Sequence, residues 1–342
     1  MTDIDSTKIA LIPIVGAAVE PGALADATGW IVKPEGLCRG ETCIPAALTP
    51  GLVLPDGSID VSVFGRATEQ LVVLDQERGL AAVGPTASVR SHTLRSLDAS
   101  DLAATTLDGE SVAISQFPGR KKLVVAFSSW CGCRHDLPAW QDLQDELGAA
   151  RFQVIAVAVD ENAEDVRPWV EEAHATFPVI LDRDRTLTER FAITNVPTVI
   201  WIDESDQVVR PNDVAFGSDL FKDYHHVDSD PHHEALRRWV LHDELPLPDT
   251  EAVRATQVVP TNEQQFARLH FRIALELHRS GDADGAQEHF DRAGSLAPDD
   301  FTIRRAQLAL RGIDPFLSDE FISLYEEWQA NGAYQYGVPT TP

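Results

Sequence analysis

The sequence predicts a central α/β domain at residues 96–245, with a small β-rich region before it and a helical extension after it. The domain is indicated by nearly continuous apolar runs rich in Val and Ile, at 121–129, 152–160, 177–182 and 197–203. Segments with helical spacing at 137–147 and 165–175 follow the first and second runs. Strands that are buried on both faces and alternate with helices are typical of a parallel-containing sheet with crossover helices.

The pattern of residues 1–95 predicts a small β-rich region, because short apolar runs such as LVLPDG and QLVVLD alternate with Pro and Gly at turn positions. The apolar stretch 9–19 is shorter than the roughly 20 residues that span a bilayer, so we expect a buried strand with a turn at Pro13. Asp3 and Asp5 precede it, where a secretory signal carries positive charge. A cytoplasmic location is therefore expected.

The C-terminal part begins with a polar, proline-bearing stretch at 246–262 that predicts a linker, and helical spacing resumes at 263–330. Its first two helices resemble one tetratricopeptide (TPR) unit. Because about three such units are needed for stability, the pair is expected to pack on the α/β domain, together with helices near 301–311 and 318–329. Residues 331–342 show no periodicity and are expected to form a loose tail.

Composition restricts the partners. The 342 residues include 28 Lys and Arg and 54 Asp and Glu, for a net charge of −26. Nucleic-acid affinity comes largely from basic side chains that neutralise phosphates, and anionic membrane surfaces also attract basic segments. Neither nucleic acid nor a membrane is an expected partner. The hydrophobic content of 44% is sufficient for packed cores and excludes a wholly disordered chain.

The chemistry is concentrated at Cys131 and Cys133, which are separated only by Gly132. A predicted strand runs through Trp130 into this pair, and a predicted helix follows it. Backbone N–H groups and the positive end of the helix dipole stabilise a thiolate at a helix N-terminus, and Arg134 adds a positive charge. Such surroundings lower a cysteine pKa from about 8.5 to roughly 3.5–7.5. A second thiol within reach can then resolve a mixed disulfide.

The segment LDGESVAISQFPGRKKLVVAFSSWCGCRHDLP resembles the opening of thioredoxin-like proteins of the TlpA/ResA and redoxin type, and FAITNVPTVIWID resembles a later signature of the same fold. The combination of WCGCR, RHDLP and VPT is similar to a ResA-like subgroup with a C-terminal TPR-like segment. This resemblance implies a thioredoxin fold, with a central mixed sheet flanked by helices, and thiol–disulfide oxidoreductase activity. It also implies a cis Val196–Pro197 bond that faces the cysteines.

The resemblance further implies a role for each motif residue. Cys131 is the attacking thiolate, Cys133 resolves the intermediate, Asp136 exchanges a proton, and Pro197 shapes the substrate groove. Trp130 is expected to be part core and part site wall. The substrate is a disulfide or a peroxide. Since no cofactor motif is visible, electrons are expected from an external donor, either thioredoxin-like or a low-molecular-weight thiol.

One departure leaves two interpretations open, because the family has two residues between its cysteines and this chain has one. A Cys-Gly-Cys disulfide closes a tighter ring, which favours a more oxidising couple. Alternatively, Cys131 works as a single attacking thiol that Cys133 resolves or positions.

Other functions are also consistent with the sequence. Ser128 precedes Cys131 by three residues, as a hydroxyl residue does in peroxiredoxins, although the upstream Pro that usually accompanies it is missing. Cys38 and Cys43 can form a second redox pair, bind a metal or simply pack. A partner-binding protein built on the TPR-like helices is a further alternative. Weak candidates for zinc or copper ligands are the histidines of one acidic segment, His225, His226, His232 and His233.

Overall fold

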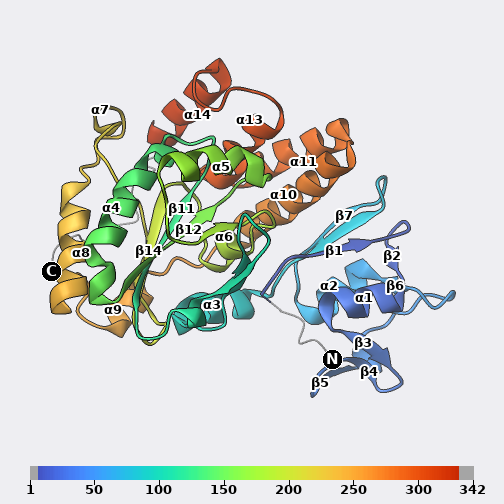
Figure 1. Ribbon diagram of the computed structural model, residues 1–342. Coiled ribbons are helices and arrows are strands. Elements are labelled where there is room, and N and C mark those ends of the chain that lie inside the picture. Colours follow the sequence, from blue (N-terminus) through green and yellow to red (C-terminus); the bar gives the residue numbers. More distant parts are fainter. Residues whose placement is uncertain (1–6, 331–342) are drawn as a thin grey trace. The chain divides into compact units, whose positions relative to one another are not determined.

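The computed structural model describes residues 7–330 (Figure 1). The chain divides into two units, each built from two separate stretches of sequence. The first unit combines the N-terminal region up to His92 with Val259–Pro298. The second combines Thr93–Val258 with the residues from Asp299 onward. The tail expected at 331–342 lies outside the described residues.

The second unit is built on a five-stranded sheet in the order β13-β12-β11-β14-β15. Its strands β11, β12 and β14 are labelled in Figure 1. The central strand β11 (Lys121–Phe127) pairs in parallel with β12 (Phe152–Ala158), which pairs in parallel with β13 (Val179–Leu181). On its other side β11 pairs antiparallel with β14 (Thr198–Ile202), which pairs antiparallel with β15 (Val208–Asp213). The four expected strands and the central mixed sheet are confirmed. Strand β15 was missed because its sequence, VVRPND, is largely polar.

Two helices pack on this sheet through tryptophans. The helix expected at 137–147 is confirmed as α4 (Leu137–Leu147), which buries Trp140 and packs against β12. Helix α8 (Asp230–His242) places its Trp239 ring on Trp201 of β14, with ring centroids 4.8 Å apart. These contacts fix α4, the helix that follows the cysteines, against β12, and fix α8 against β14.

None of the helices in residues 7–330 is long and apolar enough to cross a membrane. Several further elements complete the stretch Thr93–Val258. One of them, α9, lies inside the stretch 246–262 that was expected to be a linker, and packs against β15. The elements are β9 (Ala103–Thr105), β10 (Ser111–Ala113), η2 (Ile114–Gln116), η3 (Gly132–Asp136), η4 (Gly148–Ala150), α5 (Ala163–Glu172), α6 (Thr186–Arg190), α7 (Lys222–His225) and α9 (Thr250–Thr256). Helix α3 (Ala87–Ser96) crosses from the first unit into the second.

The helices near 301–311 and 318–329 are confirmed, and they belong to the second unit as expected. They are α12 (Phe301–Arg304), α13 (Ala306–Leu310) and α14 (Asp319–Ala330). The backbone N–H of Phe301 donates to the carbonyl of Thr194, in the loop before β14, at 2.8 Å. This C-terminal segment has its own apolar cluster, formed by Phe301, Leu308, Phe321, Leu324, Tyr325 and Trp328.

The first unit confirms the β-rich N-terminal region and adds two helices to it. Its core includes Ile12, Leu24 and Phe64, all fully buried. The strand expected within 9–19 is β1, which ends at Pro13 as expected. The elements are β1 (Ala10–Pro13), β2 (Ala18–Val19), α1 (Pro21–Thr28), β3 (Ile31–Lys33), β4 (Gly36–Arg39), β5 (Thr42–Pro45), η1 (Ala46–Leu48), β6 (Ile59–Asp60), α2 (Val61–Thr68), β7 (Val72–Asp75) and β8 (Leu80–Val83).

The TPR-like helix pair is α10 (Asn262–Ser280) and α11 (Ala283–Leu296), and it packs on β7 and β8 of the first unit. Gly281 ends α10 with φ of +88°, a left-handed conformation that favours glycine. His289 Nε2 lies 3.2 Å from the Asp75 carboxylate. The expectation that this pair packs on the α/β domain is therefore wrong. Its apolar face is covered by the N-terminal sheet, which provides the burial that a single helix pair lacks.

We expect Leu269→Ala to destabilise the first unit by about 2–5 kcal/mol, the usual range for such core truncations. Leu269 is fully buried, and its Cδ2 lies 3.1 Å from where a Cβ on Gly84 would stand. Hydrogen exchange read by mass spectrometry should become faster in β7 and β8. The exposed His278→Ala on the same helix is the control. Faster exchange confined to β11 and β12 would contradict this packing.

Candidate active site

The cysteine motif connects the end of β11 to the helix that follows. Cys131 is the N-cap of η3, and η3 leads directly into α4. The backbone N–H of Cys133 donates a hydrogen bond to Cys131 Sγ at 3.3 Å. The sulfur therefore takes the capping position, where otherwise unpaired N–H groups favour a negative charge. The strand–cysteine–helix arrangement expected from the sequence is confirmed.

The loop before β14 lies against this motif. The Val196–Pro197 peptide bond is cis, as the resemblance implies. Cys131 Sγ donates a hydrogen bond to the Val196 carbonyl at 3.4 Å. The antiparallel register pairs Ala126 with Thr198, which places the residues after β11 beside those before β14. Sheet pairing thus brings together two motifs that are distant in sequence.

The two thiols are buried, with 4% of Cys131 and 3% of Cys133 exposed, and their pKa values shift in opposite directions. Burial raises the pKa of both. At Cys131 this is outweighed by hydrogen bonds from the Cys133 thiol and amide and by the positive charge of Arg305, which lower the pKa to about 7. The pKa of Cys133 stays well above its usual value because burial and the neighbouring Cys131 disfavour its thiolate. At pH 7 about half of Cys131 is therefore thiolate, whereas Cys133 remains a thiol.

Asp136 lies at the end of η3 and is buried. Burial raises the pKa of its carboxyl to about 6, and hydrogen bonds from Gly217 and Ser218 only partly oppose this. The Ser218 hydroxyl donates to Asp136 Oδ1 at 2.7 Å. Its negative charge raises the pKa of both cysteines, so the carboxylate is close enough to influence them electrostatically. A carboxyl group whose pKa lies close to neutral pH suits proton exchange with a thiol.

Ser128 is fully buried and does not line the cavity beside the cysteines. Its hydroxyl lies 3.4 Å from the Trp130 backbone N–H, which donates to it. The next residue, Ser129, donates through its hydroxyl to Asp160 Oδ1 at 2.5 Å. Burial raises the pKa of Asp160 to about 6. These bonds hold the turn between β11 and the cysteines, and the peroxidase role of Ser128 stays a prediction.

Arg134 is engaged on the side of the motif. Its Nη1 donates to the Ser129 carbonyl at 2.5 Å, and its guanidinium lies 4.2 Å from the centre of the Trp169 ring. A second cation, Arg305 on the C-terminal segment, contributes more directly to the low pKa of Cys131. Its guanidinium lies 5.7 Å from the Trp130 ring. The sequence analysis missed Arg305 because it stands in an ordinary helical pattern far along the chain.

A cavity of about 260 Å³ opens onto the cysteines and Pro197. Its other walls are mainly aromatic, and several of them come from the C-terminal segment. Gly132 lies directly under two of these rings. A Cβ at this position would approach Phe221 to 2.9 Å and Phe316 to 3.3 Å, so the rings and the motif pack at a distance that suits glycine.

The four candidate histidines lie in two places, His225 and His226 at the end of α7 and His232 and His233 at the start of α8. His225 lines the cavity and stacks on Phe216, with ring centroids 3.6 Å apart. Burial lowers the pKa of His225 to about 4. His226 is exposed. At the start of α8, His232 accepts a hydrogen bond from Trp201 Nε1 at 3.2 Å, and His233 packs on the Trp140 ring.

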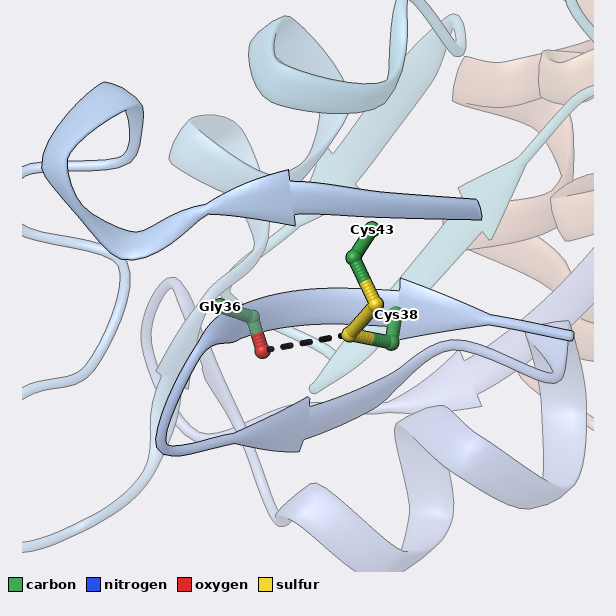
Figure 2. The surroundings of a disulfide bond; sticks show 3 residues. All are labelled: Gly36, Cys38 and Cys43. Carbon is green, nitrogen blue, oxygen red and sulfur yellow. Dashed lines mark hydrogen bonds between the residues drawn. A yellow bond between two sulfur atoms is a disulfide. The ribbon is translucent and has the colours of Figure 1, made fainter. Parts of the chain in front are cut away.

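Cys38 and Cys43 form a disulfide between β4 and β5 (Figure 2). The two residues are direct partners in the antiparallel pairing, with Cα atoms 4.1 Å apart. Together with Glu35, they make the one group of three or more potential metal ligands found within residues 7–330. In the disulfide form the sulfurs offer no thiolate to a metal. A redox role for the pair stays a prediction.

Comparison with known proteins gives matches to the part of the chain that holds this site. Residues 84–224 match the family model described as Redoxin. The thioredoxin-like protein YneN of Bacillus subtilis is 29% identical over 110 residues, which cover 31% of this chain and 64% of YneN. The thiol–disulfide oxidoreductase ResA of Halalkalibacterium halodurans is 25% identical over 105 residues, covering 30% of this chain and 60% of ResA. The chain thus spans less than two thirds of the length of these relatives.

Solved structures give similar matches. A putative thiol:disulfide interchange protein DsbE from Chlorobium tepidum aligns with a TM-score of 0.31 and 28% identity, covering 32% of this chain and 79% of that one. StoA from Bacillus subtilis aligns with a TM-score of 0.30 and 22% identity, covering 35% of this chain and 92% of StoA.

The cytoplasmic location expected from the sequence is wrong in the light of these relatives. ResA, StoA and DsbE are extracellular or membrane-anchored oxidoreductases. A neighbour from Mycobacterium tuberculosis is described as a secreted disulfide oxidoreductase. The expectation rested on the charge pattern before one apolar stretch, which is a weak signal for location.

The pH dependence of thiol alkylation should show the electrostatics of the site. The rate at Cys131 is expected to rise with pH through a midpoint at about 7 and then to level off, because the thiolate is the reactive form. Arg305→Gln removes a nearby positive charge and should move this midpoint upward by roughly one pH unit. The control is Arg304→Gln, which removes the neighbouring arginine that pairs with Glu327. Equal midpoints in Arg305→Gln and Arg304→Gln would contradict the role of Arg305.

Proposed function

The chain contains a redoxin domain at residues 84–224, and we propose that it is a thiol–disulfide oxidoreductase in which Cys131 and Cys133 form the redox pair. The observation that carries the proposal is the opposite shift of the two thiol pKa values at a helix N-terminus beside the cis Pro197. The relative ResA, which is named a thiol–disulfide oxidoreductase, supports the same chemistry.

The first step is attack by the Cys131 thiolate on one sulfur of a substrate disulfide. A bond forms between Cys131 Sγ and that sulfur, the substrate S–S bond breaks, and the other substrate sulfur leaves as a thiolate that takes a proton. Backbone N–H groups of η3 and the Arg305 guanidinium stabilise the thiolate before attack. The Val196 carbonyl and Pro197 border the position where the substrate chain lies.

In the second step Cys133 loses its proton and attacks Cys131 Sγ. The mixed disulfide breaks, the second substrate thiol leaves, and Cys131 and Cys133 become a disulfide. The backbone N–H of Cys133 binds Cys131 Sγ at 3.3 Å, and this proximity of the two residues supports the exchange. Asp136 accepts the proton of Cys133. Two electrons have then passed to the substrate, and an external dithiol restores the reduced pair.

Redox titration of the full chain in glutathione buffers, with disulfide mapping by mass spectrometry, tests the proposal. Thioredoxin-like couples lie between about −270 and −120 mV, and a reversible Cys131–Cys133 bond is expected in this window. Failure to form this bond at any potential would overturn the dithiol mechanism. The single-thiol peroxidase alternative would then be tested by adding hydrogen peroxide and measuring oxidation of Cys131.

The roles of the two cysteines can be separated by substitution. Cys133→Ser should trap a stable mixed disulfide on Cys131, because no second thiol remains to resolve it. Cys131→Ser should trap none and lose turnover, because the pKa of Cys133 is too high for attack at neutral pH. Mass spectrometry after mixing each variant with a disulfide substrate reads out both results. The reverse pattern would exchange the two roles.

Asp136→Asn is expected to slow resolution rather than attack. Loss of a positioned proton acceptor costs typically about 10²–10⁴ in rate, whereas removal of a negative charge favours the Cys131 thiolate. Rapid quenching should therefore show faster formation and slower decay of the mixed disulfide. Ser218→Ala, which removes only the partner hydroxyl of Asp136, is the milder control. A uniform loss in both steps would indicate a purely structural role.

A further inference from the structure

The cover over the redox pair limits what can reach it. Both thiols are almost fully buried. Gly132 lies between the two cysteines in sequence, and the rings of Phe221 and Phe316 pack over it. On the far wall, Tyr224 of α7 stacks on Tyr325 of α14, with ring centroids 4.6 Å apart. A disulfide on the surface of a folded protein has to reach a cysteine of which only 4% is exposed. The cavity beside the cysteines and Pro197 offers a small molecule a shorter approach.

The cavity itself favours an apolar or aromatic body. Its volume of about 260 Å³ lies just under the range of roughly 300–1,000 Å³ typical of small-molecule sites. About half of its lining residues are aromatic, and among them Tyr224, Phe316, Phe321, Tyr325 and Trp328 come from α7, the loop 315–318 and α14. Aromatic walls contribute dispersion and ring stacking to a ligand that leaves water.

Arg305 is the cation of this lining. Only 7% of its surface is exposed, and its guanidinium lies 4.5 Å from the Phe321 ring and 4.8 Å from the Phe316 ring. Its Nε donates to the Pro315 carbonyl at 3.0 Å. Within residues 7–330 no carboxylate forms an ion pair with it. A guanidinium has five N–H donors. One binds the Pro315 carbonyl and the charge acts on the Cys131 thiolate, so once that sulfur has reacted the remaining donors suit an anion.

Building on the proposed function, we propose that the substrate is a small organic disulfide with an apolar or aromatic body and a carboxylate or similar anionic group. The Cys131 thiolate attacks the substrate sulfur that lies beside Pro197, and the leaving half departs as a thiol after protonation. The anionic group binds Arg305. Cys133 then forms the bond to Cys131 and releases the second half as a thiol. An external dithiol supplies the two electrons that regenerate the pair.

The test measures oxidation of the reduced full chain by small disulfides of different charge. The probes are 5,5′-dithiobis(2-nitrobenzoate), which is aromatic and anionic, 4,4′-dithiodipyridine, which is aromatic and neutral, and cystamine, which is aliphatic and cationic. Insulin serves as the protein disulfide. Each rate is divided by the rate of the same probe with free reduced glutathione, so that intrinsic reactivity cancels. Ionic strength is held near 0.15 M, where charges beyond about 8 Å are largely screened.

The normalised rate should be highest for the anionic aromatic probe and lowest for insulin. Arg305→Gln should reduce the ratio of the anionic to the neutral aromatic rate by roughly tenfold, the effect of one lost hydrogen bond to a charged group. This ratio cancels any change in thiolate nucleophilicity, since both probes react with the same sulfur. Arg305→Lys should retain most of the ratio, and Arg304→Gln all of it. Phe316→Ala should increase the rate with insulin by opening the wall.

Two results distinguish this inference from the proposed function. If insulin reacts as fast as the small probes after normalisation, or if Arg305→Gln leaves the ratio unchanged while Arg305→Lys is folded and active, the substrate class is wrong and the oxidoreductase proposal stands. If no probe converts Cys131 and Cys133 to a disulfide, the oxidoreductase proposal itself fails.

Discussion

The position of the Cys131 sulfur is the constraint on which the rest of the site depends. A buried thiolate is unstable unless dipoles and charges replace the water it has lost. The amide and thiol of Cys133 and the guanidinium of Arg305 provide that replacement. The hydrogen bonds between Ser129 and Asp160 and the pairing of β11 with β14 fix the position of Cys131 Sγ relative to these groups.

Burial also separates the tasks of neighbouring groups. The same low-polarity surroundings raise the pKa of Cys133 and of Asp136, whereas the donors around Cys131 keep its pKa low. At pH 7 about half of Cys131 is therefore thiolate, Cys133 is a thiol, and Asp136 is largely an ionised carboxylate able to accept a proton. This is the combination that a two-step exchange requires, because attack needs a thiolate and resolution needs a proton acceptor.

The chain completes this site with residues far from the motif. After α9 it forms α10 and α11 in the first unit, and it then returns to the second unit as α12, α13 and α14. The redoxin family match ends at residue 224. Arg305 and the aromatic residues of α14 lie beyond it, so the counter-charge and much of the cavity wall come from outside the shared domain. Under the proposed function, the residues that would select the substrate therefore lie largely in the C-terminal segment.

The sequence by itself determined the four central strands, the helix after the cysteines and the facing of Cys131 by Val196–Pro197. Continuous apolar runs and a motif at a strand end are local signals, so the elements they predict do not depend on which other parts of the chain they meet. Only the tertiary structure decided that α10 and α11 belong with β7 and β8, and that Arg305 rather than Arg134 is the main cation at Cys131. Both outcomes depend on which surfaces meet after folding, and neither Arg305 nor the apolar face of α10 carries a local mark of its eventual partner.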